Sequence, residues 1–256
     1  MTDADDPRLD DYRNLRGREH DDVLWAEGPT VVERLLASSL TTRSVLCSPA
    51  AHARLATQLD STSIAVYVAE QAVINAVVGF DLHRGAIAVA ERPPLHTLAD
   101  LCAGAHRLVV LQGINDAVNL GAIARSARAL GADGLVLDPT CADPYYRRSV
   151  RVSMGEMFHL PIARAPLASV FEHLRAAGIA AWALTPRADA VSIGSIARAG
   201  VPAQLALVVG AEGHGLSEDV LAANMNVRIP MVVGVDSLNV GHAVAAALAV
   251  VQSSTL

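Results

Sequence analysis

The sequence predicts an α/β protein in two parts, the second with a mostly parallel sheet. Two observations lead to this fold class. Short apolar runs recur along the chain, and stretches with helical spacing separate them. Glycine-rich or polar segments directly follow several of the runs, which is where open α/β sheets place their ligand-binding loops. Strands that alternate with helices indicate a parallel sheet covered by helices on both faces.

The first part begins with a charged segment and continues as a small α/β unit. Residues 1–22 mix aspartates with arginines without periodicity, so we expect a flexible arm or an irregular helix. Pro29 opens a predicted helix at about residues 28–38. Three apolar runs predict strands at Ser44–Cys47, Ile64–Val68 and Ala86–Ala90. We therefore expect a small domain at residues 23–95 and a linker at 96–106.

The second part, residues 107–256, has the clearer alternation. Its predicted strands are Leu108–Leu111, Gly134–Leu137, Ala180–Leu184, Leu205–Val209 and Val227–Ile229. Its predicted helices are Gly121–Leu130, Leu167–Ala176, Ser217–Ala223 and Ser237–Val251. This order predicts a single larger α/β domain in the second part.

The composition excludes several classes of protein. Hydrophobic residues make up 52% of the chain, yet no apolar run reaches the roughly 18 residues that a membrane span requires. The acidic N-terminus does not resemble a secretory signal, so we expect a cytoplasmic protein. Three widely spaced cysteines, Cys47, Cys102 and Cys141, predict neither disulfides nor a metal site.

The charge pattern bears on nucleotide and nucleic-acid binding. The net charge of −6 is a weak argument against a nucleic-acid partner. The chain contains no lysine, which excludes a P-loop, and no G-x-G-x-x-G follows a strand in a first βα turn. All 20 basic residues are therefore arginines, which bind phosphates in a bidentate manner and stack on bases.

Three segments carry candidate chemistry, each after a predicted strand. Asn119–Arg125 offers Asn119 as a helix cap and places Arg125 in the helix. Gly210–Leu216 has three glycines in six residues, so its backbone could wrap a ligand around Glu212. The third segment runs from Ile229 to Ala243; Ser237 or Asn239 could cap the last helix, but a cap explains only one of them.

One local cluster of basic residues is a candidate for binding RNA. Arg147, Arg148, Arg151 and Arg164 face only Asp143 and Glu156 in the same stretch, a local balance of +2. Single-stranded or looped RNA could be held there through its phosphates. A solvated charged surface is the alternative interpretation.

The three segments together resemble the SpoU (TrmH-like) family of RNA 2′-O-ribose methyltransferases, within the SPOUT superfamily. The resemblance covers about residues 107–251 and is carried by Asn119–Arg125, Gly210–Leu216, Ile229–Met231 and Ser237–Val240. It implies an α/β domain with a deep trefoil knot that forms the pocket for S-adenosylmethionine, and a homodimer that packs through this domain. The first part resembles the small substrate-binding domain that often precedes this core, with Glu27-Gly28-Pro29 opening a helix.

The resemblance also implies roles for individual residues. The methyl donor would be held by backbone groups around Gly210, Gly215, Ile229, Leu238 and Val240. The catalytic residues would be Arg125, Asn119, Glu212, Ser237 and Asn239. RNA would be bound by the first part and by the basic residues Arg13, Arg16, Arg147, Arg148 and Arg151. Ribosomal RNA is slightly favoured over transfer RNA because of the additional N-terminal domain.

Two versions of the mechanism remain open for Arg125. It could be the general base, although a guanidinium normally stays protonated. Alternatively, it binds the adjacent phosphate and orients the hydroxyl, and the proton leaves late. Two other functions are also compatible with the fold: a non-catalytic RNA-binding or ribosome-assembly factor, and an α/β enzyme for another adenine nucleotide. The missing P-loop and dinucleotide fingerprints argue against the latter.

Overall fold

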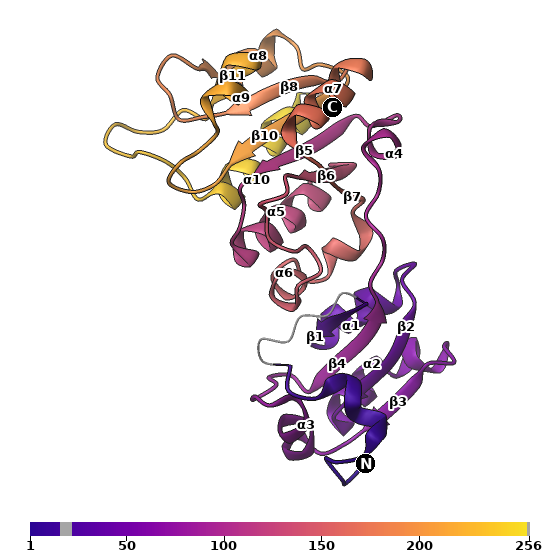
Figure 1. Ribbon diagram of the computed structural model, residues 1–256. Coiled ribbons are helices and arrows are strands. Elements are labelled where there is room, and N and C mark those ends of the chain that lie inside the picture. The colour runs from indigo at the N-terminus through magenta and orange to yellow at the C-terminus, as the bar shows by residue number, and fades with distance from the viewer. Residues whose placement is uncertain (16–21, 255–256) are drawn as a thin grey trace. The chain divides into compact units, whose positions relative to one another are not determined.

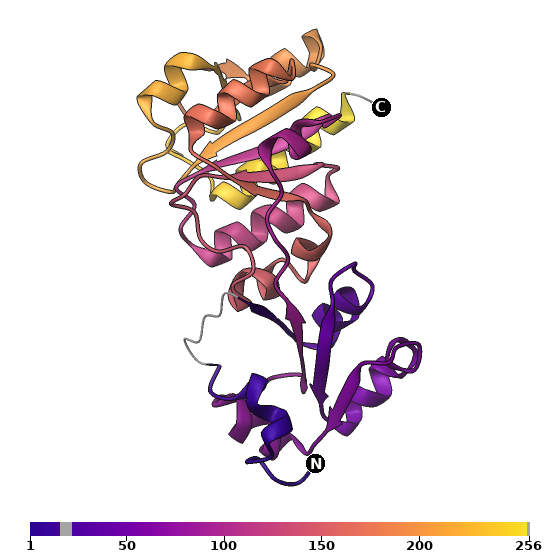
Figure 2. The ribbon, with the colours of Figure 1, turned by 45° about the vertical axis from the view of Figure 1, so that its right-hand side comes forward.

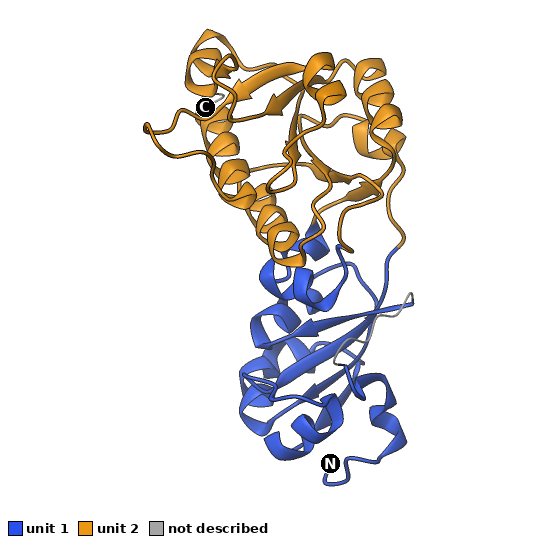
Figure 3. Ribbon diagram, turned by 60° about the vertical axis from the view of Figure 1, so that its left-hand side comes forward, with its two compact units in different colours: residues 1–93, 144–159 blue, residues 94–143, 160–256 orange. Residues whose placement is uncertain are grey.

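The contacts between residues divide the chain into two units, which are described separately below. Unit 1 comprises residues 1–93 and 144–159, and unit 2 comprises residues 94–143 and 160–256 (Figure 3). The computed structural model describes residues 1–15 and 22–254. Unit 1 is thus built from two stretches of chain that are distant in the sequence, which the pattern of strands and helices did not predict.

Unit 1 contains a four-stranded mixed sheet in the order β1-β4-β2-β3 (Figure 1). Its strands are β1 (Val23–Glu27), β2 (Thr42–Cys47), β3 (Ala65–Val68) and β4 (Ala86–Glu91). Its helices are α1 (Pro29–Leu36), α2 (Pro49–Asp60), α3 (Gln71–Val78) and α6 (Arg147–Val152), with 3-10 helices η1 (Pro7–Tyr12) and η2 (Glu156–His159). Helices α1 and α2 pack together, whereas α3 lies beside η1.

The N-terminal residues pack against the rest of unit 1. Of the two expectations for residues 1–22, the irregular helix and not the flexible arm describes residues 7–12, and residues 16–21 lie outside the described part of the chain. Leu9, Tyr12 and Leu15 are fully buried in a core formed with α3 and the sheet. The Tyr12 hydroxyl lies 2.7 Å from the Ser44 hydroxyl, and the Trp25 indole donates to the Asp11 carbonyl at 3.0 Å. Three apolar side chains at helical spacing are what fixes this segment to the sheet.

The segment 144–159 joins unit 1 through charged groups. Glu27, at the end of β1, is 8% exposed and accepts from Arg147 at 3.0 Å and from Arg151 at 2.8 Å. Arg34 of α1 donates to the Met154 carbonyl and pairs with Glu156 at 3.2 Å. A buried carboxylate needs such partners, which explains why this segment belongs with β1 and α1.

Unit 2 contains a seven-stranded sheet in the order β7-β6-β5-β10-β8-β11-β9, with every neighbouring pair parallel (Figure 2). The strands are β5 (Arg107–Gln112), β6 (Gly134–Leu137), β7 (Ile162–Arg164), β8 (Ala180–Leu184), β9 (Val191–Ser192), β10 (Leu205–Gly210) and β11 (Met225–Arg228). The predicted mostly parallel sheet is therefore confirmed.

Helices cover both faces of this sheet. They are α4 (Leu98–Cys102), α5 (Ala117–Ala129), α7 (Leu167–Ala176), α8 (Ile193–Ala199), α9 (Glu218–Ala223) and α10 (Val240–Ser253). Leu108 and Val110 of β5 share a core with α4, α7 and α9. Their neighbours Val109 and Leu111 are equally buried and point to the other face; on that face α5 and α10 pack together.

Two helices begin at other residues than the sequence predicted. Helix α5 begins at Ala117 instead of Gly121, because the Asp116 carboxylate accepts from the backbone N–H groups of Val118 and Asn119. Asp116, not Asn119, is therefore the cap, and Asn119 lies in the first turn. Helix α10 begins at Val240 and is capped by Asn239, one of the two predicted candidates.

Other sequence expectations concern cysteines and membrane spans. Cys47, Cys102 and Cys141 are all buried and unpaired. Burial raises the pKa of the Cys47 thiol to about 11. Within the described part of the chain, no helix has both the length and the apolar character needed to cross a membrane.

We predict that Leu9→Ala lowers the free energy of unfolding by about 2–5 kcal/mol, because the removed side chain leaves a cavity in a closed core. Urea denaturation followed by tryptophan fluorescence measures the change. Thr2→Ala, at an exposed position of the same segment, is the matched control. Equal stability of the two variants would show that η1 contributes no packing.

Candidate active site

A tight glycine loop follows β10 at the carboxyl edge of the unit 2 sheet. The loop Ala211–Gly215 closes on itself, since the Gly215 N–H donates to the Ala211 carbonyl at 2.9 Å. A Cβ at Gly210 would lie 2.2 Å from the carbonyl carbon and oxygen of Gly215. Gly215 has a φ of +68°, which favours glycine. Both glycines are therefore required by the loop's own geometry.

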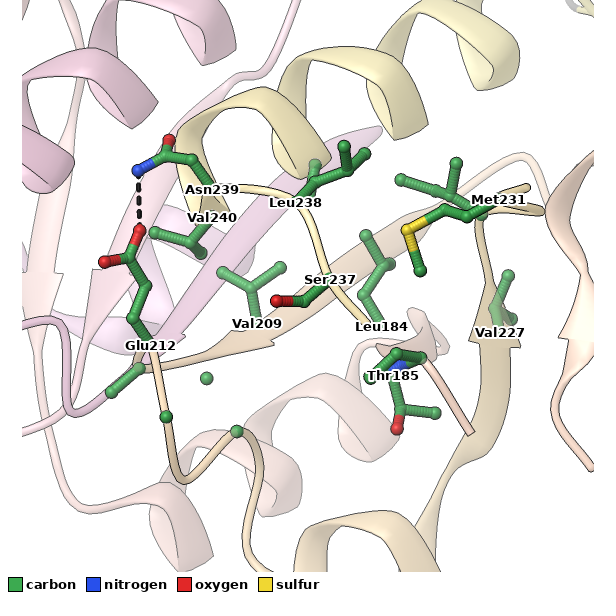
Figure 4. Close-up of a pocket in the computed structure, with 17 residues that line it drawn as sticks. Leu184, Thr185, Val209, Glu212, Val227, Met231, Ser237, Leu238, Asn239 and Val240 are labelled. Atoms are coloured by element: carbon green, nitrogen blue, oxygen red, sulfur yellow. Dashed lines mark hydrogen bonds between the residues drawn. The ribbon is translucent and has the colours of Figure 1, made fainter. Parts of the chain in front are cut away.

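A cavity of about 480 Å³ opens beside this loop, where β8, β10 and β11 end (Figure 4). Its volume lies in the range of small-molecule sites, and the carboxyl edge of a parallel sheet is the usual place for them. Much of the lining is apolar, from Leu184, Val209, Val227 and Met231. The segment between β11 and α10 closes the other side through Ile229, Ser237 and Leu238.

The side chain of Asn239 connects three elements around the cavity. Its Oδ1 accepts from the Gly241 N–H at 3.0 Å and from the His242 N–H at 3.4 Å, which caps α10. Its Nδ2 donates to Asn119 Oδ1 of α5 at 2.8 Å and to Glu212 Oε1 of the glycine loop at 2.6 Å (Figure 4). One amide thus fixes α5, the glycine loop and α10 to each other.

Gln112 makes a second connection between the ends of β5 and β10. Its Oε1 accepts from the Ser217 N–H at 2.9 Å, and its Nε2 donates to the Ser217 hydroxyl at 3.0 Å. Ser217 is the N-cap residue of α9. The glycine loop is therefore held on both sides, by Asn239 at Glu212 and by Gln112 at its far end.

Comparison with known proteins identifies the family of this chain. The model of the SpoU rRNA Methylase family matches residues 106–249. The chain belongs to this family. The match spans both the glycine loop and the Asn239 network, so the residues that line the cavity lie within the matched part of the chain.

Similar proteins cover nearly the whole chain. An uncharacterised tRNA/rRNA methyltransferase of Mycobacterium tuberculosis is 41% identical over 97% of this chain and 89% of its own. The 23S rRNA (guanosine(2553)-2′-O)-methyltransferase of Bacillus subtilis is 28% identical over 96% of each chain. The crystal structure of an AdoMet-bound rRNA methyltransferase from Sinorhizobium meliloti is 26% identical, with a TM-score of 0.81, and covers 100% of this chain and 98% of that one.

The structure brings most of the predicted site residues together. Asn119, Glu212 and Asn239 are hydrogen-bonded, and Ser237 lines the cavity. All five residues predicted to hold the methyl donor line the cavity as well: Gly210, Gly215, Ile229, Leu238 and Val240. Arg125 is the exception, because it is exposed on α5 and is not part of the lining.

The residues predicted to bind RNA belong to unit 1. Those that the structure describes differ in whether they are paired with acidic side chains. Arg147 and Arg151 pair with Glu27, and Arg147 also stacks on the Phe80 ring at 4.4 Å. Burial lowers the pKa of Arg147 from its ordinary value. Arg13 pairs with Asp10 at 2.8 Å, and Arg16 lies outside the described residues. Arg148 is exposed.

Three residues of the site were not predicted from the sequence. Leu184 and Thr185 line the cavity at the end of β8, and Gln112 holds the glycine loop. Each stands at or directly after the carboxyl end of a predicted strand, and that position was the signal available for finding them.

We predict that Gly210→Ala lowers the free energy of unfolding by about 1–3 kcal/mol, since the new methyl group would overlap backbone atoms. Gly194→Ala in α8 is the control: its Cβ would lie 3.7 Å from Arg198 Nη1, an ordinary van der Waals distance, and alanine favours a helix. Chemical denaturation of both variants measures the difference. Equal stability would mean that the Gly210–Gly215 approach is not tight.

Proposed function

We propose that this protein transfers the methyl group of S-adenosylmethionine to a ribose 2′-hydroxyl of ribosomal RNA. The observation that carries the proposal is the cavity at the carboxyl edge of β8, β10 and β11, whose lining residues all lie within the range that the SpoU family model matches. Membership in the family supports methyl transfer to RNA. The name of the Bacillus subtilis relative, a 23S rRNA 2′-O-methyltransferase, supports the ribose hydroxyl and ribosomal RNA.

The cavity fits the chemistry of the methyl donor. S-adenosylmethionine presents an adenine ring, a ribose and a charged methionine part, and it supplies an electrophilic methyl group when bound. Apolar walls from Leu184, Val209 and Leu238 suit the ring, and the bare backbone at Gly210 and Gly215 offers hydrogen-bonding groups without steric hindrance. The AdoMet-bound structure of the Sinorhizobium meliloti enzyme supports the same ligand.

Arg125 remains the candidate for contacting the RNA at the reacting ribose. It makes no hydrogen bond or ion pair within the described residues of the chain, so its guanidinium is free to bind a phosphate. Since a guanidinium stays protonated at ordinary pH, we favour the version in which Arg125 binds and orients the substrate over the one in which it is the base.

The proposal extends to unit 1 as the RNA-recognition part of the protein. Glu27 neutralises one of its two arginine partners, so Arg147, Arg148, Arg151 and Glu27 together carry an excess of two positive charges. Such a local excess binds phosphates even when the whole protein is acidic. Arg148 and the half-exposed Arg151 would make these contacts.

We also propose the trefoil knot and the homodimer that the family resemblance implies. The position of β10 between β5 and β8, although it follows both in the sequence, is compatible with a knotted path. The dimer is supported by exposed apolar side chains near the cavity, since Val232 is 75% exposed and Val233 is 104% exposed. Apolar surface of this kind often marks an interface.

Calorimetric titration tests the methyl donor. We predict saturable binding of S-adenosylmethionine and S-adenosylhomocysteine, and no binding of NAD or ATP, because the chain lacks both standard nucleotide fingerprints. Absence of binding by the folded protein would argue against the proposed function and in favour of a non-catalytic RNA-binding factor.

We predict that Arg125→Ala nearly abolishes methylation of a ribosomal RNA transcript, whereas Arg125→Lys retains measurable activity because a lysine still binds phosphate. Incorporation of labelled methyl groups measures both. Arg128→Ala, one turn later on the exposed side of α5, is the matched control. Complete loss in an Arg125→Lys protein that still binds S-adenosylmethionine would favour Arg125 as the base.

A further inference from the structure

The loop Asp81–Gly85, between α3 and β4, contains an arginine with a strained backbone (Figure 1). Arg84 has a φ of +80°, a left-handed conformation that is unfavourable for residues with a Cβ. Among the described residues other than glycine, only Asn14 and Met154 also have a positive φ. Asparagine adopts this conformation readily, and the Met154 carbonyl is held by the Arg34 guanidinium at 2.6 Å. Neither explanation applies to Arg84.

The shape of this loop does not depend on the Arg84 side chain. Asn75 Oδ1 accepts from the Leu82 N–H at 3.0 Å, and the Leu82 side chain is buried in the core of unit 1. The Ser48 N–H donates to the Gly85 carbonyl at 2.7 Å. A Cβ at Gly85 would lie 2.5 Å from the Ser48 hydroxyl oxygen, so the loop requires glycine there. The loop is therefore fixed by contacts on both sides of residue 84.

The Arg84 guanidinium is an unpaired cation. Its side chain is exposed and makes no hydrogen bond or ion pair with any residue that the structure describes. The carboxylate of the same loop, Asp81, accepts from Asn75 Nδ2 at 3.1 Å. An arginine whose donors are unused can bind two oxygens of one phosphate. Backbone strain that is retained at such a residue indicates a function.

The loop lies at the edge of the unit 1 sheet to which the basic segment α6 is attached. Strands β1 and β2 run antiparallel to β4, so both end where β4 begins. Glu27, the partner of Arg147 and Arg151, is the last residue of β1. The Arg147 guanidinium lies 4.4 Å from the ring centre of Phe80, the residue directly before the loop. Arg84 therefore adds a free cation beside an existing group of arginines.

We propose that Arg84 binds a phosphate of the substrate RNA and is presented for this contact by a preformed loop. The inference rests on the proposed function for the identity of the ligand. A nucleic acid fits because its backbone repeats phosphates, which several arginines at one edge can contact together. A loop that is already fixed loses little conformational entropy when the RNA binds. This gain offsets the strain at Arg84.

The variant Arg84→Gly separates RNA binding from the stability of the loop, because glycine adopts a φ of +80° without strain. Arg84→Lys keeps the charge. The control is Arg43→Gln, which removes an exposed arginine at the start of β2, at the opposite edge of the same sheet. Filter binding to in vitro transcribed 23S rRNA over a range of salt concentrations gives Kd, and thermal unfolding gives Tm. Calorimetry measures the binding of S-adenosylmethionine.

We expect Arg84→Gly to weaken RNA binding about tenfold. The slope of log Kd against log salt should fall by about 0.7, the value for one lost phosphate contact with a single strand. The Tm should equal or exceed that of the wild type, because the strain is relieved. Arg84→Lys should lose less affinity, since it gives up only the bidentate geometry. Arg43→Gln should bind RNA as the wild type does, and every variant should bind S-adenosylmethionine equally.

Other outcomes overturn the proposal. Unchanged RNA affinity and salt slope in Arg84→Gly would show that Arg84 does not contact the RNA. An equal loss in Arg43→Gln would show a general effect of charge, and a lower Tm of Arg84→Gly would assign Arg84 a structural role. Failure of the proposed function is distinguishable: a wild type that binds RNA through Arg84 but transfers no methyl group would contradict that function and leave this inference standing.

Discussion

The Asn239 amide is the interaction on which the arrangement of the site depends. It uses all four of its hydrogen-bonding positions at once: two acceptor sites cap α10, and two donors hold α5 and the glycine loop. The three partners come from sequence positions that are far apart. An aspartate here could cap the helix, but it would present oxygens instead of donors to Asn119 and Glu212. The requirement for both functions in one short side chain selects asparagine.

The parallel sheet of unit 2 brings the partners of the Asn239 amide close together. Because the neighbouring strands are all parallel, β5, β8, β10 and β11 end at the same edge. Each loop that leaves this edge brings either a polar side chain or a bare backbone to the cavity. Gln112 and Ser217 hold the glycine loop from the side opposite Asn239. The cavity is therefore bounded by loops that are fixed to each other, although few of them have regular structure.

The sequence allowed five of the seven strands of unit 2 and most residues of the site to be predicted, because apolar runs and glycine patterns are local signals. Strands β6 and β8 and helix α7 match their predicted bounds. Strand β1 was missed because Val23–Glu27 is buried throughout, so its sequence shows no alternation of apolar and polar residues, and it ends in a glutamate. Strand β9 is too short to show a pattern. The partnership of Glu27 with Arg147 and Arg151 joins residues about 120 positions apart, which no local pattern reveals. The basic cluster was therefore predicted as a surface free to bind RNA, although Arg147 and Arg151 are paired with Glu27.

The discontinuity of unit 1 has a consequence for how such proteins can be recombined. The linker after Pro93 looks like a natural place to exchange N-terminal parts between homologues, yet the sixteen-residue segment that completes unit 1 is encoded inside the other unit. A chimera joined at the linker would combine the Glu27 of one parent with the arginines of the other. We therefore expect such chimeras to fold only when both parents share this charge pairing. The sequences of the two units depend on each other more strictly than their separate cores would suggest.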